Sequence, residues 1–354
     1  MSENEVESSG LRVEHPNGGG SEPSQFSALN SQLPLSPNQK AWRRFKNHRL
    51  AVGCGLFLLA LLLLILAWPS VSTYPPETVS DAQFQPPSTG HWLGTDVHGR
   101  DLTSRIFFGA RVSLLVGLVG AGVSLIIGVL WGAVAGYLGG RWDSFLMRVV
   151  DVLYSLPSIV FVIVLVTTLH GFVEVWQSTD VAKKIPNVVS FLSHLGIPLR
   201  PVSPELGRQL KFIGLFAGLG AVSWLTMARI VRGQVLSLRT RPFVDASRAL
   251  GASHAWILRR HILPNVIGII IVYLTLTVPS IILYESFLSY LGLGIQPPQA
   301  SLGSLIAEGA MQINPIRIYW WLIVFPGVML VATLLALNFL GDGLRDALDP
   351  RADR

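Results

Sequence analysis

Six stretches of the sequence are apolar over roughly the length that a helix needs to cross a lipid bilayer. A spanning helix requires about 20 apolar residues, because each residue advances the helix by about 1.5 Å. Half of the 354 residues are hydrophobic and 14% are charged, a balance that favours a membrane protein over a water-soluble domain. We therefore expect an all-α membrane protein with six transmembrane helices. These are predicted at residues 50–68, 112–138, 152–170, 212–228, 262–284 and 318–340.

The two ends of the chain differ from this apolar body. Residues 1–39 are rich in Ser, Asn, Pro, Gly and Glu and poor in aromatic side chains, which predicts a disordered tail. Residues 40–69 are predicted to form an amphipathic lead-in and the first span. This span starts too far along the chain for a signal peptide, so we interpret it as an uncleaved anchor. Residues 70–111 would then be external, and residues 342–354 would form the C-terminal end.

The lysine and arginine residues divide unevenly between the two sides of such a bundle. With six spans both termini lie on one side, and 18 of the 27 Lys and Arg residues fall in the two terminal segments, the 139–148 loop and the 229–261 loop. Because positive charge accumulates on the cytoplasmic side, we expect these parts and both termini to be cytoplasmic. This distribution explains the pI of about 9.7 without any nucleic-acid partner. The external side would hold residues 69–111, 171–211 and 285–317.

The second span carries small residues at a strict spacing of four. That spacing places them on one helix face, where another helix can approach closely. We therefore expect a packing face, used inside the protein or between subunits. Its residues are Gly120, Ser124, Gly128, Gly132 and Gly136.

Residues 241–265, RPFVDASRALGASHAWILRRHILPN, form a short basic insert between two apolar stretches. Pro242 suits the first turn of a helix, and Asp245 places a negative charge near its N-terminus. Gly251 can adopt the positive φ that ends such a helix, and Ser253 can cap the next one. We therefore expect a helix of about two turns, a turn, and a second helix that leads into the fifth span.

The short helix is predicted to be largely apolar although charged residues flank it. An apolar face that its own chain does not cover favours docking of a partner protein. A solvated basic loop is the plain alternative. A DNA-binding helix-turn-helix is disfavoured, because membrane spans flank the insert on both sides.

The insert resembles a loop of bacterial ABC importer permeases with the pattern E-A-A-x3-G-x9-I-x-L-P. Here Asp245 stands for the Glu, Ser247 for the second Ala and His261 for the Ile, and Leu263 and Pro264 match. In that family the loop forms the coupling helix, which docks in a groove of an ATPase subunit. The resemblance implies that coupling to the ATPase rests on Phe243, Asp245, Ala246, Ala249, Gly251, Leu263 and Pro264.

The resemblance extends from about residue 40 to the end and is nearest to the C subunits of oligopeptide permeases. It is carried by residues 90–117, 136–157, 222–238, 285–298 (ESFLSYLGLGIQPP) and 341–351 (GDGLRDALDPR). It implies the transmembrane domain of a type I ABC importer in a bacterial inner membrane, with a permease domain over 112–341 and a coupling loop over 239–262. The tail and the 171–211 segment are departures from the family, and the resemblance implies no role for them.

The sequence lacks the phosphate-binding loop of an ATPase. No GxxxxGK[ST] occurs, and none of the five lysines follows a glycine. We therefore expect a permease subunit that is not itself an enzyme and binds no cofactor, with ATP and Mg held by partner chains. The partners implied by the resemblance are a second permease subunit, two ATPase subunits, an external peptide-binding protein and membrane lipid, with no nucleic acid.

Two pairs of polar residues lie at predicted helix ends. Tyr284 and Glu285 end the fifth span externally, where an acid could meet the ammonium group of a peptide, or could serve an interhelical contact. Arg229 and Arg232 end the fourth span, where we expect them to reach the membrane surface and bind terminal carbonyls, or to contribute to coupling.

An external segment containing His91, Asp96, His98 and Asp101 raises the question of a metal site. No helical i, i+4 pair or cysteine accompanies these residues, which disfavours it. We expect this segment to be an elbow on the membrane surface ahead of the second span. Cys54 is the single cysteine, so an internal disulfide is excluded.

Substrates other than oligopeptides stay open at this point, because related importers carry dipeptides, nickel or glutathione on the same scaffold. A self-sufficient secondary transporter is disfavoured, since its path needs charged residues at mid-membrane and these spans carry almost none. A structural or sensing membrane protein would leave the pattern of the basic insert unexplained.

Overall fold

The computed structural model describes residues 37–177, 203–295 and 299–348. Within these ranges the chain is nearly all helical, with one isolated β-bridge between Thr95 and Asp101. In chain order the helices are α2 (Pro37–Asn47), α3 (Arg49–Val71), α4 (Leu102–Leu138), α5 (Gly140–Ser155), α6 (Ser158–Gln177), α9 (Pro204–Leu238), α10 (Pro242–Ala249), α11 (His254–Ile257), the π-helix η1 (Leu258–Ile262), α12 (Leu263–Tyr290), α13 (Leu302–Met311) and α14 (Trp321–Leu348).

Six helices of the described residues are long and apolar enough to cross a membrane, which confirms the predicted number. They are α3, α4, α6, α9, the continuous run α11–η1–α12, and α14. The helix α2 occupies most of the predicted amphipathic lead-in. The predicted disordered tail lies outside the described residues except for its last three positions, which begin α2.

Several spans are longer than their apolar cores predict. The helix α4 begins at Leu102, ten residues before the predicted start of the second span, so residues 102–111 are helical. Both ends of the expected 171–211 loop are also helical, because α6 continues to Gln177 and α9 starts at Pro204. Two charged residues at these ends have partners within the protein, Arg105 with Glu308 and Lys211 with Glu174, so these helices can continue where hydropathy falls.

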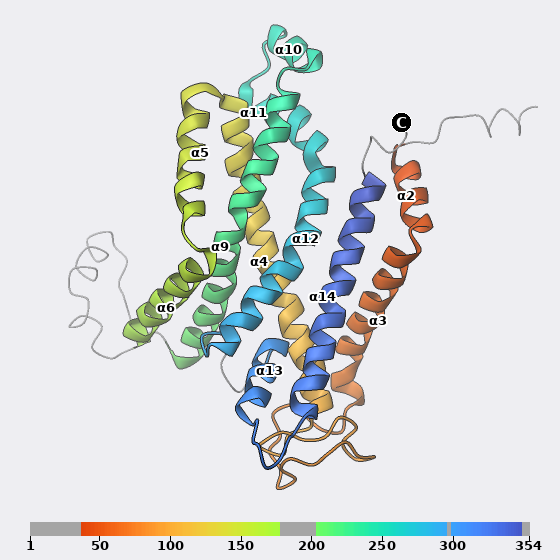
Figure 1. Ribbon diagram of the computed structural model, residues 1–354. Coiled ribbons are helices and arrows are strands. Elements are labelled where there is room, and N and C mark those ends of the chain that lie inside the picture. Colours follow the sequence, from red (N-terminus) through yellow and green to blue (C-terminus); the bar gives the residue numbers. More distant parts are fainter. Residues whose placement is uncertain (1–36, 178–202, 296–298, 349–354) are drawn as a thin grey trace, which may run out of the picture.

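The third span was predicted wrongly as one helix over 152–170. Instead, α5 ends at Ser155 and α6 starts at Ser158, and α5 also fills most of the expected 139–148 loop. Between them Leu156 is extended, with φ −77° and ψ 137°. Pro157 explains the break, because a proline ring disfavours helical backbone at the residue before it. The helix α6 therefore leaves at an angle to α5 (Figure 1).

The small-residue face of α4 packs against α9 inside the chain. A methyl group at Gly132 would overlap the carbonyl oxygen of Ala228, and one at Gly136 would lie 2.8 Å from the carbonyl oxygen of Arg232. Ser124, between them and Gly120 on this face, is fully buried. The stripe thus lets the two backbones approach more closely than any side chain would permit.

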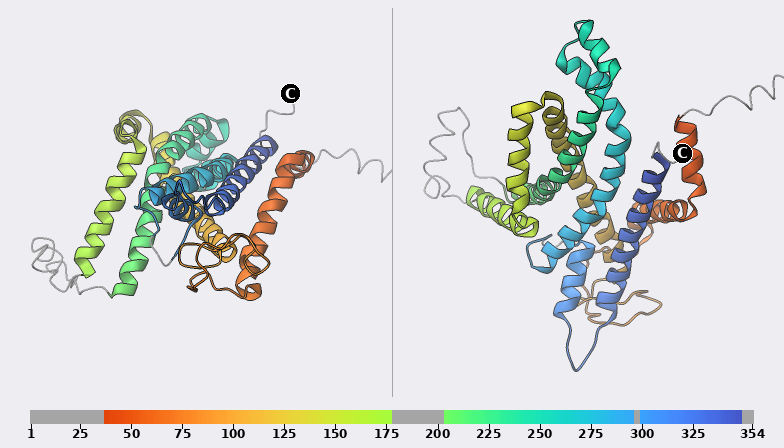
Figure 2. Two further views of the ribbon diagram at one scale, coloured as in Figure 1. Left: turned by 60° about the horizontal axis from the view of Figure 1, so that its bottom comes forward. Right: turned by 45° about the horizontal axis from the view of Figure 1, so that its top comes forward.

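The two ends of the bundle differ in what they carry. The helices α2 and α10 and the C-terminal end of α14 lie at one end, and residues 72–101 with α13 lie at the other (Figure 1). Viewed from another side, α10 projects beyond the neighbouring helices (Figure 2). The described N- and C-terminal helices therefore approach the end of the molecule that carries the basic insert.

Residues 72–101 form a folded cap that is held by ion pairs, and this cap and the start of α4 contain the segment that was expected to be an elbow. Arg105 Nη1 lies 2.6 Å from Asp96 Oδ2 and 2.7 Å from Glu308 Oε2 on α13. Arg100 Nε also lies 2.7 Å from Asp96 Oδ2. The side chains of Asp96 and Arg105 are 5% and 2% exposed, so the surroundings are dry and the charges are mutually compensated.

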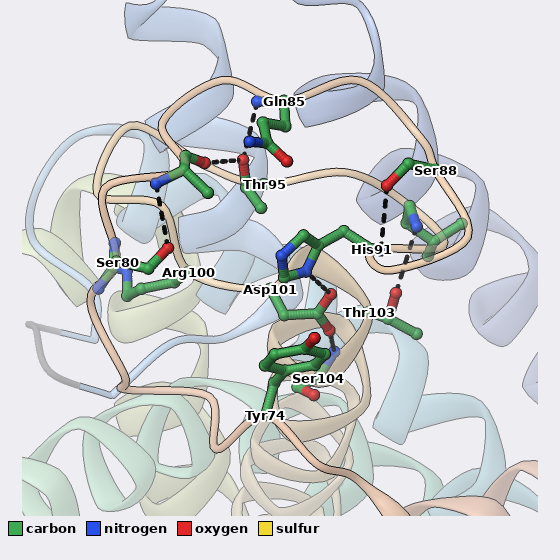
Figure 3. Close-up of polar contacts among 12 residues, drawn as sticks. Tyr74, Ser80, Gln85, Ser88, His91, Thr95, Arg100, Asp101, Thr103 and Ser104 are labelled. Atoms are coloured by element: carbon green, nitrogen blue, oxygen red, sulfur yellow. Dashed lines mark hydrogen bonds and ion pairs between the residues drawn. The ribbon is translucent and has the colours of Figure 1, made fainter.

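Asp101 and His91, which like Asp96 were considered for a metal site, also have structural partners in this cap. Asp101 caps α4 by accepting a hydrogen bond from the backbone N–H of Ser104, at 2.8 Å (Figure 3). His91 Nδ1 lies 3.0 Å from the other carboxylate oxygen of Asp101. Phe84 stacks on Tyr319, with ring centroids 4.2 Å apart, which joins the cap to the start of α14.

Candidate functional site

The short helix predicted in the basic insert is present as α10, and it ends as expected. Gly251 has φ +80°, a conformation that side chains with a Cβ rarely adopt. The N–H of Gly251 donates to the Arg248 carbonyl at 2.9 Å, and that of Ala252 donates to the Ser247 carbonyl at 3.1 Å. This pair of bonds is a Schellman motif, which fixes the direction in which the chain leaves the helix.

One apolar residue anchors α10, and others on its surface are exposed. Val244 is fully buried in a cluster with Val231, Val235 and Ile257. Leu250, by contrast, is 89% exposed at the tip. Phe243 on α10 and Trp256 on α11 are also exposed. The exposed surface of α10 further includes Asp245, Ala246 and Ala249. The insert therefore presents an apolar surface on a fixed base, an arrangement typical of a docking site.

The second helix of the insert continues into the fifth span without a break. Ser253 caps α11 by accepting a hydrogen bond from the Trp256 N–H at 3.3 Å. The chain then passes through η1, in which the Leu263 N–H donates to the Leu258 carbonyl, and enters α12. Pro264 has no N–H to donate, and a local π turn is one way in which a helix accommodates such a gap. Sequence reasoning missed this turn.

The predicted coupling residues fall into two places. Phe243, Asp245, Ala246 and Ala249 lie on α10 and Gly251 ends it, whereas Leu263 and Pro264 lie at the start of α12 beyond the π turn. Leu263 packs against the apolar cluster that holds Val244. The first group forms the exposed surface, and the second belongs to the support that connects it to the membrane.

Contacts from the end of α4 support the insert, and no periodic pattern of residues indicated them. Tyr137 Oη lies 3.0 Å from His254 Nδ1, and the guanidinium of Arg248 lies 5.8 Å from the Tyr137 ring centroid. Arg239 donates hydrogen bonds of 3.3 Å to the carbonyls of Gly136 and Tyr137. A cavity of about 470 Å³ lies between these groups and α10.

Replacing Tyr137 with phenylalanine should loosen α10 without unfolding the bundle. The change removes the hydrogen bond to His254, and one such bond contributes about 1 kcal/mol. We expect amide hydrogen exchange in residues 243–250 to become about fivefold faster, because local opening would cost that much less. Tyr154→Phe is the matched control, because Tyr154 lies near the C-terminal end of α5, away from the insert. It should leave the exchange of residues 243–250 unchanged. Equal exchange in both variants would contradict the supporting role.

Arg229 and Arg232 do not bind terminal carbonyls as expected, because α9 continues past them to Leu238. Arg232 instead makes two hydrogen bonds to Asp143, of 2.5 and 2.7 Å. Arg229 Nη2 lies 2.8 Å from Asp151 Oδ1. Both arginines therefore tie α9 to α5, which the sequence did not reveal because α5 was interpreted mainly as a loop.

A second feature is a cavity of about 580 Å³ at the break between α5 and α6. Tyr284, one of the two residues predicted for a substrate path, lines it together with residues of α9 and α12. Hydroxyl groups and aromatic rings contribute much of the wall. The residues that supply them include Tyr154, Ser158, Ser223, Tyr273, Thr277 and Ser280.

Glu285, the other residue predicted for that path, does not line this cavity. Its side chain is 0% exposed, and Oε1 accepts hydrogen bonds from Ser289 and Ser301. The helix α12 also continues beyond it to Tyr290, so Glu285 does not end the span. The structure thus gives Glu285 the interhelical contact that the sequence favoured over a contact with substrate.

Comparison with known proteins identifies the family. Residues 128–354 match the model of the binding-protein-dependent transport system inner membrane component, and residues 36–87 match that of the N-terminal transmembrane domain of oligopeptide transport permease C. The chain is 42% identical over 318 residues to the oligopeptide transport system permease protein OppC of Escherichia coli K12, covering 88% of this chain and 91% of that protein. It is 44% identical to OppC of Salmonella typhimurium, with the same coverage of each chain.

A relative named for a different substrate is about as similar. The dipeptide transport system permease protein DppC of Bacillus subtilis is 41% identical over 323 residues, which cover 90% of this chain and 88% of that protein. Together with the six apolar helices, these matches indicate a multi-pass protein of the inner membrane. The chain therefore belongs to the family of inner membrane components of binding-protein-dependent transport systems.

Proposed function

We propose that this chain is the transmembrane subunit of an ATP-driven importer of oligopeptides, and that α10 is its docking element for a separate ATPase subunit. The observation that carries the proposal is the exposed surface of α10, with Leu250 89% exposed at its tip while Val244 is fully buried beneath it. A solvated loop would have no physical reason to present leucine on a rigid base. A groove on a partner protein gives it one.

The coupling mechanism follows from how α10 is connected. Closure of the ATPase subunits on ATP displaces the docking groove, and α10 moves with it as a rigid body. On one side α10 joins α9 directly, and on the other the Schellman turn at Gly251 leads into the continuous helix from His254 to Tyr290. Displacement of α10 is therefore delivered to two membrane helices that line the 580 Å³ cavity.

The complete transporter on this proposal contains a second permease subunit, two ATPase subunits and an external peptide-binding protein. ATP and Mg are held by the ATPase subunits, and this chain binds no cofactor. Support comes from the sequence, which lacks a GxxxxGK[ST] loop, and from the family, whose members are membrane components of such systems.

Both termini are cytoplasmic in this proposal, on the same side as α10. Two observations support this orientation. The described ends of the chain, α2 and the last turns of α14, lie at the α10 end of the bundle (Figure 1). The two terminal segments, the 139–148 loop and the 229–261 loop also carry 18 of the 27 Lys and Arg residues, which favour the cytoplasmic face.

The cavity at the α5–α6 break is proposed as this chain's part of the substrate path. Hydroxyl and aromatic groups around Tyr284 can contact a peptide backbone without selecting one side chain. No ionised side chain of the described residues lines it, which suits a path for peptides of varied sequence. This composition supports a broad class of short peptides, dipeptides being the alternative that the DppC relative favours.

Transport by the purified complex tests the proposal. The chain is expressed with its neighbouring genes, purified, reconstituted in liposomes and supplied with ATP, the binding protein and labelled peptides of increasing length. We expect ATP-dependent accumulation of peptides longer than dipeptides, and none with a non-hydrolysable nucleotide. Accumulation of dipeptides alone would replace the substrate assignment, and accumulation that is independent of ATP would refute the mechanism.

A further inference from the structure

Glu285 lies at the centre of a buried polar junction between α12 and α13. Its Oε1 accepts hydrogen bonds from the hydroxyls of Ser289, at 2.6 Å, and Ser301, at 2.7 Å. Ser301 is also the N-cap of α13, in a capping box with Ser304. The same carboxyl oxygen therefore contacts a residue on its own helix and the N-cap residue of α13.

The helix α4 completes this junction. Ser113 on α4 accepts a hydrogen bond of 3.1 Å from the backbone N–H of Leu302, the first residue of α13. The surfaces around these bonds are in close contact, since a methyl group at Gly303 would overlap Ser286 of α12. One at Gly109 of α4 would lie 3.2 Å from the Leu302 nitrogen. The N-terminus of α13 is thus held between two membrane helices.

A buried acid is a costly way to join helices. Glu285 is 0% exposed, no basic side chain of the described residues pairs with it, and its Oε2 has no hydrogen-bond partner among them. Well-packed apolar residues commonly stabilise a helix junction at least as well as a buried ionisable group. What hydrogen bonds add is direction, because they fix one register between α12 and α13.

The position of Glu285 connects this junction to the opposite end of the molecule. Glu285 lies on the helical run that starts at His254, directly after the turn at Gly251 that ends α10. The helix α13 lies at the far end of the bundle, beside residues 72–101 (Figure 1). Any displacement of α10 that shifts α12 therefore reaches α13 through the Glu285 junction.

We propose that Glu285 is a positioning residue for transport, which holds α13 on α12 so that movement of α10 repositions the external end of the chain. This inference rests on the proposed function, because the movement is supplied by the ATPase subunits. Glu285 itself contacts no substrate. Its task is to keep the external helix in register with the helix that carries the displacement.

Two cysteine reporters test this transmission separately. In the assembled complex with Cys54→Ala, one reporter is Leu250→Cys at the tip of α10 and the other is Met311→Cys at the end of α13, since both positions are exposed. The labelling rate with a hydrophilic maleimide is measured in nanodiscs with and without ATP and vanadate. In the parent complex we expect both rates to change on nucleotide trapping.

The variant Glu285→Leu should separate the two reporters. The Leu250→Cys reporter should still respond to nucleotide, whereas the ratio of trapped to nucleotide-free rates at Met311→Cys should fall to about one. Glu285→Gln keeps an oxygen that accepts both serine hydroxyls, so it should restore the response. Ser286→Ala is the matched control, because the Ser286 hydroxyl is buried without a hydrogen-bond partner among the described residues.

The outcomes distinguish the inference from the function on which it rests. A parental response at Met311→Cys in Glu285→Leu would overturn the role of Glu285 while leaving the docking of α10 intact. A parent complex in which Leu250→Cys never responds to nucleotide would overturn the proposed function itself, and the inference with it. Should Glu285→Leu fail to assemble, Ser301→Ala removes the hydrogen bond that joins Glu285 to α13 and should reduce the Met311→Cys response, and an undiminished response would overturn the role.

Discussion

Gly251→Val is expected to lower peptide-stimulated ATP hydrolysis by about tenfold or more in the assembled complex, with the protein still inserted in the membrane. Gly251 has φ +80°, and a β-branched residue in that region is strained by about 1–3 kcal/mol. The strain is relieved when the chain leaves α10 in a different direction, which breaks the Schellman hydrogen bonds. About 1.4 kcal/mol corresponds to a factor of ten in affinity. A strain of this size, or the misplaced α10 that relieves it, should therefore weaken docking by about tenfold or more.

Two substitutions control for this effect. Gly251→Asn should retain most of the stimulation, because asparagine tolerates a positive φ better than other residues with a Cβ. Gly268→Ala, on α12, should change little, because its backbone is helical and its Cβ would meet open space. Wild-type stimulation in Gly251→Val would show that the direction of the turn is unimportant for coupling.

Gly132→Val is expected to have the largest structural effect in the membrane domain. The new side chain would overlap the carbonyl oxygen of Ala228 and crowd the backbone of Arg232, so α4 and α9 would have to separate. Overpacking of this kind costs about 3 kcal/mol. We expect a lower melting temperature in detergent and less monodisperse complex, both measured by size-exclusion chromatography after heating.

The same helix offers a matched control for this prediction. Gly122 also lies on α4, but a Cβ there meets no atom within 4 Å. Gly122→Val should therefore leave the melting temperature near that of the parent protein. An equal fall in melting temperature in the two variants would mean that α4 requires glycine at any position, and that close contact with α9 is not the reason for the stripe.

The sequence predicted those structural features that depend on residues close together along the chain. Apolar length predicted six spans, and the spacing of Gly128, Gly132 and Gly136 predicted the face of α4 that another helix approaches. The end of α10 was also predictable, since Gly251 followed two turns of helix-forming residues. Each of these features depends on neighbours within a few residues along the chain.

Features that depend on distant partners could not be predicted in this way. Arg105 was expected in the external segment ahead of the second span, yet it lies inside α4 with partners at Asp96 and Glu308. Glu285 was considered for a substrate path because it is an acid near a predicted helix end, yet its partner Ser301 is the N-cap of another helix. A charged residue near a predicted helix end does not reveal whether water or a buried partner satisfies it.

The break at Pro157 and the π turn before Pro264 show a further limit. Both prolines were visible in the sequence, and each lacks a backbone N–H. At Pro157 the chain breaks between two helices, whereas at Pro264 the helix continues through η1. Packing against neighbouring helices decides between these outcomes, and the sequence alone does not show it.

Cross-linking from α10 tests most directly whether this helix docks on an ATPase subunit. The substitution Ala249→Cys is introduced in the complex with Cys54→Ala. The complex is treated with a short bifunctional reagent, and the products are identified by mass spectrometry. Met311→Cys, at the opposite end of the bundle, serves as the control. We expect the cysteine at position 249 to be joined to the ATPase subunit and the one at position 311 not to be. An ATPase cross-link from position 311 with none from position 249 would contradict the proposed mechanism.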